Sequence, residues 1–248
     1  MPADSYETTV LDTKISALDS RVKSPACYSC SGLAVAGSLV SFMPEISAIH
    51  REDVLDSMLL ASLSASKNHN RQDNPATWYR AYISVLEKIG WIMQANDTST
   101  FSLCFNSMSS NTIVNLLFDG AERQVTQETM DALKKRLPFH AEKTEMPIFN
   151  APATLNGTWN LLLSVAQAKN DSPTITLGEA KWLMDIDNKD YLSFHFFDAR
   201  INGNKSIRRM VLNEATYGPI RAEIKKKLGN AIEKEITCLN ANDYSVDH

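Results

Sequence analysis

The segment from Asn74 to Gly90 constrains the fold more than any other part of the chain. The Asn74 side chain can cap a helix, and Pro75 fits the first helical position because its missing N–H group would have no partner there. Large apolar residues then recur at spacings of three and four until Gly90, a residue type typical of helix ends. They are Trp78, Tyr82, Val85, Leu86 and Ile89. The pattern predicts a helix from Pro75 with one buried face.

After this helix the apolar residues change to a spacing of two, which is typical of strands. Apolar residues at alternate positions stand on both sides of the polar residues 96–100. They are Trp91, Met93, Phe101, Leu103 and Phe105. We therefore predict a β-hairpin with its turn at residues 96–100.

Alternation also dominates the second half of the chain, beyond the proline-bearing segment 138–157. Asn202-Gly203 is the strongest short hairpin signal there, because both residue types accept a positive φ. The predicted strands are 159–165, 175–184, 192–196 and 207–212, with turns at 170–173, 185–190 and 202–203. Together they predict a four-stranded antiparallel β-meander over about residues 158–212.

Helical periodicity predicts four further helices, and with the meander they define an α+β fold. Their ranges are 50–66, 110–119, 126–137 and 220–236, the last being a long C-terminal helix. We expect the N-terminal helices and this C-terminal helix to pack against the sheet. Residues 1–45 are expected to form an N-terminal arm, and residues 46–248 a single α+β domain, with any internal boundary near 138–157.

Composition narrows the class of protein. The net charge of −4 gives no basic field that would hold a phosphate backbone, so no nucleic-acid partner is expected. The polar, acidic first ten residues do not form a conventional signal peptide. The longest apolar stretch, 32–43, is well short of the ~20 residues that span a bilayer. We expect a soluble protein, cytoplasmic or exported without a conventional signal peptide.

No motif of the common enzyme classes appears, and no cofactor or metal is predicted. Cys27 and Cys30 form a C-x-x-C pair, but the residues before and after them do not have the patterns of the strand and the helix that flank a redox C-x-x-C motif. No second ligand pair at matching spacing suggests zinc. The two residues are therefore expected to be reduced thiols. Their position just before the apolar stretch 32–43 makes S-acylation an alternative.

A candidate ligand site comes from the faces of the predicted meander. Tight turns would gather Trp159, Leu161, Leu163, Trp182 and His195 on one face, with His195 between Ala180 and Met210. The same face would carry the small residues Gly178, Ala180 and Ser193, which leave room for an elongated apolar ligand. The other face would gather Glu179, Lys181, Asp198 and Arg209. A solid core and a hydrogen-bonded core histidine are the competing interpretations.

Three functions follow as hypotheses. The first is a non-catalytic protein that binds a lipid-like or fatty acyl chain between sheet and helices, and that contacts membranes peripherally and reversibly as an effector. The second is a thiol-dependent enzyme that pairs Cys27, Cys30 or Cys104 with a histidine such as His195. The third is a structural or interaction protein that acts through its surface or through self-assembly.

Overall fold

A computed structural model describes residues 32–107, 110–118, 154–155, 158–169, 172–183 and 195–238. The strands are β1 (Gly32–Val35), β2 (Ser38–Phe42), β3 (Trp91–Ser107), β4 (Thr154–Leu155), β5 (Thr158–Lys169), β6 (Ser172–Leu183), β7 (His195–Leu212) and β8 (Ile236–Cys238). The helices are α2 (Ala48–Asn68), α3 (Pro75–Lys88), α4 (Ser110–Phe118), α7 (Glu214–Tyr217), the 3-10 helix η2 (Gly218–Ile220), α8 (Arg221–Leu228) and α9 (Ala231–Glu235).

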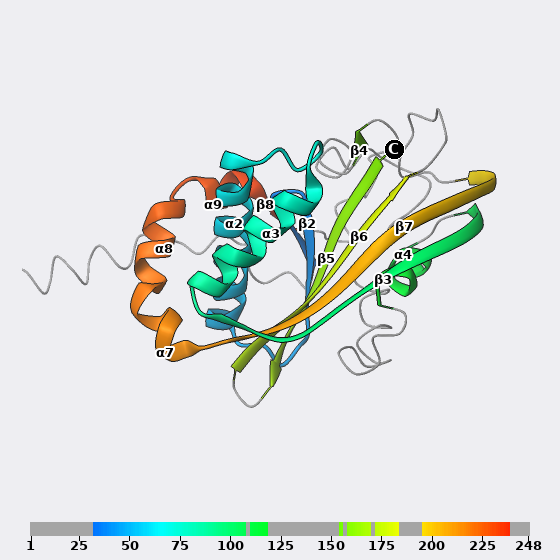
Figure 1. The fold of residues 1–248 in the computed structure, drawn as a ribbon. Helices are drawn as coiled ribbons and strands as arrows, with labels where there is room; N and C mark the ends of the chain where they lie inside the picture. The colour runs from blue at the N-terminus through cyan, green and yellow to red at the C-terminus, as the bar shows by residue number, and fades with distance from the viewer. Residues whose placement is uncertain are drawn as a thin grey trace, which may run out of the picture.

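The predicted α+β class is confirmed. The strands form one sheet in the order β3-β7-β6-β5-β2-β1-β8, with β4 added beside β5. All pairings between described strands are antiparallel except that of β2 with β5. Helices α2, α3 and α8 gather at one side of the sheet, whereas α4 packs against β6 and β7 at the other (Figure 1).

The first two strands of the predicted meander are confirmed as β5 and β6, whose register runs from Thr158 opposite Leu183 to Lys169 opposite Ser172. The rest of the prediction needs correction. β7 continues without a turn through Asn202-Gly203, and Gly203 lacks the positive φ that the predicted turn needs. A Cβ atom on Gly203 would overlap the carbonyl oxygen of Lys181, so close approach of β6 explains this glycine.

The hairpin predicted over residues 91–105 is also wrong. Helix α3 ends as expected, with Gly90 at a φ of 110°, but the chain then forms the single strand β3. β3 is an edge strand that pairs with β7 from Trp91 opposite Leu212 to Ser107 opposite His195. Residues 96–100 are exposed, so their polarity reflects a solvated sheet edge and not a turn.

Residues 32–42, which the sequence assigns to the N-terminal arm, form the β1–β2 hairpin inside the sheet. Ala36 and Gly37 both have a positive φ, 45° and 75°, at its turn. β2 lies beside β5, with Leu39 opposite Leu163, and this position buries the apolar stretch on both faces. Residues 1–31 lie outside the described part of the chain.

The C-terminal helical segment is confirmed, but in two pieces. Gly229, at a φ of 48°, separates α8 from α9, and Ile236 already belongs to β8, which pairs with β1. Helix α8 packs against α2. The predicted helices 50–66 and 110–119 correspond to α2 and α4. The predicted helix 126–137 and the predicted turn 185–190 lie outside the described residues.

The main hydrophobic core lies between the sheet and the helices α2 and α3. From its central strands the sheet contributes residues that include Leu162, Ala166, Ile175, Leu177 and Met210, and their neighbours in sequence point to the opposite face. In the described part of the chain, no helix combines the length and the apolar character that crossing a bilayer requires.

Candidate functional site

The structure brings most of the predicted ligand residues to one face of the sheet. Trp159 lies opposite Trp182, Leu161 opposite Ala180, and Leu163 opposite Gly178, so all of them share the face that α4 covers. Leu161, Leu163 and Trp182 are buried there, and the Trp182 ring contacts Phe101 edge-on at 6.5 Å. The Trp159 side chain is not among those described.

His195 occupies a different place from the one predicted. Its pairing with Ala180 and Met210 is wrong, because Ala180 lies opposite Lys205 and His195 opposite Ser107. The register of β6 with β7 is displaced by ten residues from the predicted one, since Leu183 at the end of β6 lies opposite Asn202 and a tight turn at 185–190 would not allow this pairing. A ligand role for His195 stays a prediction.

Helix α4 fills the space that Gly178 leaves on this face. The Phe118 ring lies 3.0 Å from the position that a Cβ of Gly178 would occupy, and the Leu117 Cβ lies 3.4 Å from it. Lys205 on β7 donates a hydrogen bond of 3.0 Å to the carbonyl oxygen of Leu116 and so ties the end of α4 to the sheet. Phe118 and Leu117 are both buried.

A second cluster, on the opposite face beneath α3, consists of Arg71, Tyr79, Tyr82, Glu179 and Arg208; we call it the polar cluster. Tyr79 and Tyr82 come from α3, Glu179 from β6 and Arg208 from β7. Arg71, from the loop after α2, donates a hydrogen bond of 2.9 Å to the carbonyl oxygen of Gly37.

The sequence missed this cluster because it depends on the register. Arg208 Nη1 lies 3.6 Å from Glu179 Oε2. Arg209, the predicted neighbour of Glu179, lies opposite Thr176 and points to the α4 side. The apolar spacing placed Tyr82 on the buried face of the helix and did not include Tyr79, and no local signal shows which strand residues they meet.

Each of the two arginines of the polar cluster lies against one aromatic ring. The Arg71 guanidinium lies 4.6 Å from the centre of the Trp78 ring, and that of Arg208 lies 4.6 Å from the centre of the Tyr79 ring. Trp78 and Tyr82 stack at 5.3 Å, and Tyr79 and Tyr82 at 6.0 Å. Each cation therefore contacts a ring of α3, and these rings stack on one another.

Burial sets the protonation states in the polar cluster. Desolvation raises the pKa of Glu179 to about 7, although Arg208 and Arg71 oppose the shift. Desolvation also raises the pKa of Tyr79 and of Tyr82 above the usual tyrosine range, and lowers the pKa of Arg71 to about 10. Near neutral pH the arginines are charged, the tyrosines are neutral and Glu179 is partly protonated, so the cluster carries net positive charge.

A third group is His50, Asp53 and Glu214, whose ligand atoms lie within 4.8 Å of one another. The Arg221 guanidinium already bonds two of these side chains, Asp53 at 2.6 and 2.9 Å and Glu214 at 2.6 Å. The cation that balances these carboxylates is thus an arginine, and the group gives no reason to infer a metal.

The residues of the thiol hypothesis are only partly described. Cys104 on β3 lies opposite Arg200, and His195 lies opposite Ser107, so the register does not place Cys104 and His195 opposite each other. Cys27 and Cys30 lie outside the described residues. A thiol-dependent activity and S-acylation both stay predictions.

Comparison with known proteins gives only distant resemblances. No family model matches the sequence, and the comparison with curated proteins gives no match. Among solved structures, a delta-endotoxin is 9% identical with a TM-score of 0.42, over 71% of this chain and 81% of that one. The activated Cyt2Ba monomer from Bacillus thuringiensis subsp. israelensis is 9% identical with a TM-score of 0.41, over 70% and 97%.

The Evf virulence factor is 9% identical with a TM-score of 0.33, over 95% of this chain and 92% of that one. At these values the resemblances carry no argument about function.

Proposed function

We propose that the protein is a non-catalytic binder of a single apolar chain, of the fatty acyl type, on the α4 side of the sheet. The observation that carries the proposal is the Phe118 ring over Gly178. The apolar ring of Phe118, which belongs to α4, fills the space that a side chain at Gly178 of β6 would occupy. A flexible hydrocarbon chain is a chemical equivalent of that group.

The side chains around Gly178 support an elongated ligand. Gly178 and Ala180 form a row of small residues along β6, between Leu161 and Leu163 on β5 and Ile207 on β7. Trp182 stands at one end of this row. A chain lying along β6 in place of the Phe118 ring would therefore contact larger apolar side chains on both sides.

The free energies of burial favour a long ligand over the ring. Burying a Phe side chain contributes about 1.5–3 kcal/mol, and each buried methylene about 0.8 kcal/mol. About four methylenes therefore match the Phe118 ring, and every further methylene favours the ligand. Affinity should rise with chain length beyond about four methylenes, and binding of shorter chains should be undetectable.

Calorimetric titration with saturated fatty acids of increasing length tests the proposal. Gly178→Val should abolish binding because its side chain occupies the space. Phe118→Ala should tighten binding, because the ring no longer competes. Ile92→Ala, a change to an exposed residue of β3, is the control and should bind like the wild type. If long-chain acids neither bind nor raise the melting temperature, the proposal fails.

Membrane association extends the proposal to an effector that contacts bilayers reversibly, since one acyl chain anchors a protein only marginally. Liposome flotation measures this association. If an acylated thiol provides the anchor, Cys27→Ser combined with Cys30→Ser should release the protein. Negligible flotation of the wild type would remove the membrane part of the proposal.

A further inference from the structure

The face beneath α3 carries a second feature that the acyl-chain proposal does not use. Buried polar atoms without a hydrogen-bond partner in the described part of the chain gather around the polar cluster. Those near the cluster are the hydroxyls of Tyr79, Tyr82 and Ser164, both side-chain polar atoms of Asn160, and Nη1 of Arg208, and further such atoms lie elsewhere in the described residues. Buried polar groups in folded proteins nearly always have partners, so such a concentration indicates an occupant.

The register shows that these groups belong to one region. Asn160 on β5 lies opposite Lys181, the residue two positions from Glu179 on the same face of β6. Ser164 lies opposite Leu177, and Leu177 lies opposite Arg208 on β7. The Tyr79 ring, on α3, contacts the guanidinium of the same Arg208. The unpaired atoms thus come from α3 and from the strands β5 and β7 on either side of β6.

The charges of this region select the chemistry of the occupant. Arg71 and Arg208 are cations, and the tyrosine hydroxyls and the Asn160 amide can donate hydrogen bonds. Among the described residues, the acid that faces them is Glu179, which forms an ion pair with Arg208 at 3.6 Å. Donors and positive charge therefore exceed acceptors, which favours an anion.

The edge of the region is partly exposed to solvent. The Arg208 and Glu179 side chains keep exposed fractions of 17% and 22%, whereas Tyr82 and Ser164 are completely buried. Solvent therefore meets the cluster at the β6–β7 side. The tyrosine hydroxyls and Arg208 Nη1 are themselves buried, so an ion reaches them from this side only when neighbouring side chains move.

We propose that the polar cluster binds a small oxyanion, a sulfate- or phosphate-like ion or a short carboxylate, through the Arg208 guanidinium and the hydroxyls of Tyr79 and Tyr82. Guanidinium groups match the paired oxygens of such ions. This site lies on the opposite face of the sheet from the proposed acyl-chain site, and either proposal can fail without the other.

The test measures the melting temperature and the heat of binding of the full chain with sodium sulfate, phosphate and acetate. Sodium chloride at equal ionic strength is the reference. A saturable response to sulfate or phosphate indicates a tetrahedral oxyanion, and one to acetate a carboxylate. If all three ions change the melting temperature and the heat only as much as chloride does, the proposal is overturned. The polar groups would then bind water, and the salts would act only by screening charges.

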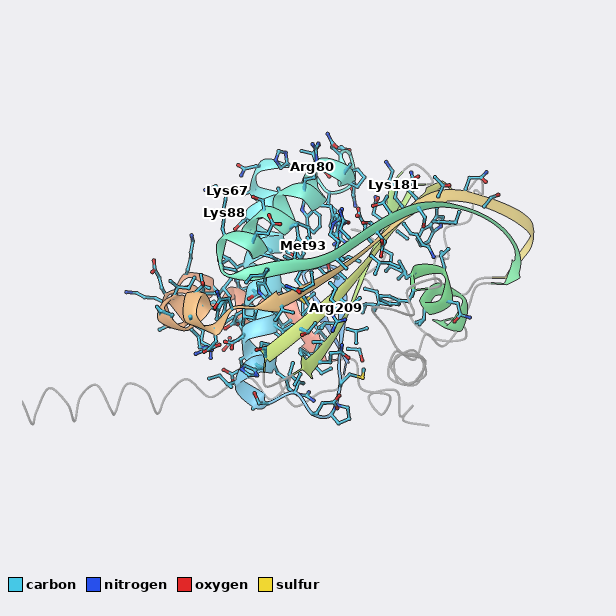
Figure 2. The ribbon with its side chains drawn as sticks, turned by 60° about the horizontal axis from the view of Figure 1, so that its bottom comes forward. Lys67, Arg80, Lys88, Met93, Lys181 and Arg209 are labelled. Atoms are coloured by element: carbon cyan, nitrogen blue, oxygen red, sulfur yellow. The ribbon has the colours of Figure 1, made fainter. Side chains whose placement is uncertain are left out.

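Three variants locate the binding. Arg208→Met should weaken it at least about tenfold. Tyr82→Phe keeps the ring packing and removes only the hydroxyl, so it should also weaken binding, and it serves even if Arg208→Met does not fold. Arg80→Met is the matched control, because Arg80 lies on the side of α3 that faces away from the sheet (Figure 2). Its dissociation constant for the ion should stay within about twofold of the wild-type value. Unchanged binding by Tyr82→Phe and Arg208→Met would overturn the assignment.

Binding should also depend on pH. Ionisation of Glu179 adds a negative charge beside Arg208, Arg71, Lys181 and Tyr79 and opposes an incoming anion. Sulfate and acetate keep their own charge between pH 6 and 8, so their binding should weaken over this range. Glu179→Gln should bind with little pH dependence, and a variant that keeps the wild-type dependence would contradict the proposed position of the anion.

Discussion

The Arg221 guanidinium forms two hydrogen bonds with the fully buried carboxylate of Asp53, at 2.6 Å from Nε and 2.9 Å from Nη2. This pair joins α8 to α2, and Lys225 and Glu52 form a second ion pair between the same helices. Removing the guanidinium would leave the Asp53 carboxylate buried without its cation.

Arg221→Ala should therefore destabilise the protein by about 3–5 kcal/mol, as expected when one partner of a buried ion pair is lost. Urea denaturation measures the free energy of unfolding. Lys226→Ala, on the exposed side of α8, is the control and should change it by less than about 0.5 kcal/mol. Similar losses for both variants would show that the Asp53 pair does not fix α8.

Glu179 should make stability depend on pH. Its pKa is about 7 in the folded protein, against an ordinary value of 4.5. Between these values the folded state binds more protons than the unfolded state, so the free energy of unfolding falls as the pH rises. The slope is at most about 1.4 kcal/mol per pH unit.

Denaturation of the wild type and of Glu179→Gln at several pH values isolates this effect. The stability of the wild type relative to the variant should fall from pH 4.5 to about 7 and stay constant above that. A difference that does not change with pH would contradict the raised pKa of Glu179.

Trp78→Ala should lower the free energy of unfolding by about 3–5 kcal/mol, because Trp78 is buried and stacks against Tyr82. Its indole Nε1 also donates a hydrogen bond of 2.9 Å to Ser66, which ties α3 to α2. Arg80→Ala, on the exposed side of α3, should change the free energy of unfolding by less than about 0.5 kcal/mol. Equal losses in chemical denaturation would mean that the wrong face of α3 is assigned to the core.

Gly203→Ala should destabilise the protein by about 1–3 kcal/mol or more, because the added Cβ collides with the Lys181 carbonyl oxygen and lies 2.8 Å from the Trp182 Cβ. Gly218→Ala is the matched control. Its Cβ meets only the flexible Glu214 side chain, at 3.2 Å, and its backbone is helical. Thermal unfolding that ranks Gly218→Ala as the more damaging change would contradict the pairing of β6 with β7.

The sequence by itself determined the elements whose signals are local. Helix α3 follows from the Asn74 cap, Pro75, the apolar spacing and Gly90, all within one short segment. Strands β5 and β6 follow from alternation and the short turn between them. Their shared apolar face, with Leu161, Leu163 and Trp182, could be predicted because a strand has a period of two and neighbours pair directly.

Only the tertiary structure decided how distant segments pair. Residues 96–100 have the composition of a turn, but pairing with β7 extends them as a strand whose polar side chains face solvent. Gly203 is also a residue type typical of turns, but the close approach of the Lys181 carbonyl oxygen explains why a glycine stands at this position of β7. The partner of Glu179 is Arg208 and not Arg209, because a register fixed by strands far apart in sequence decides which of two adjacent residues meets it.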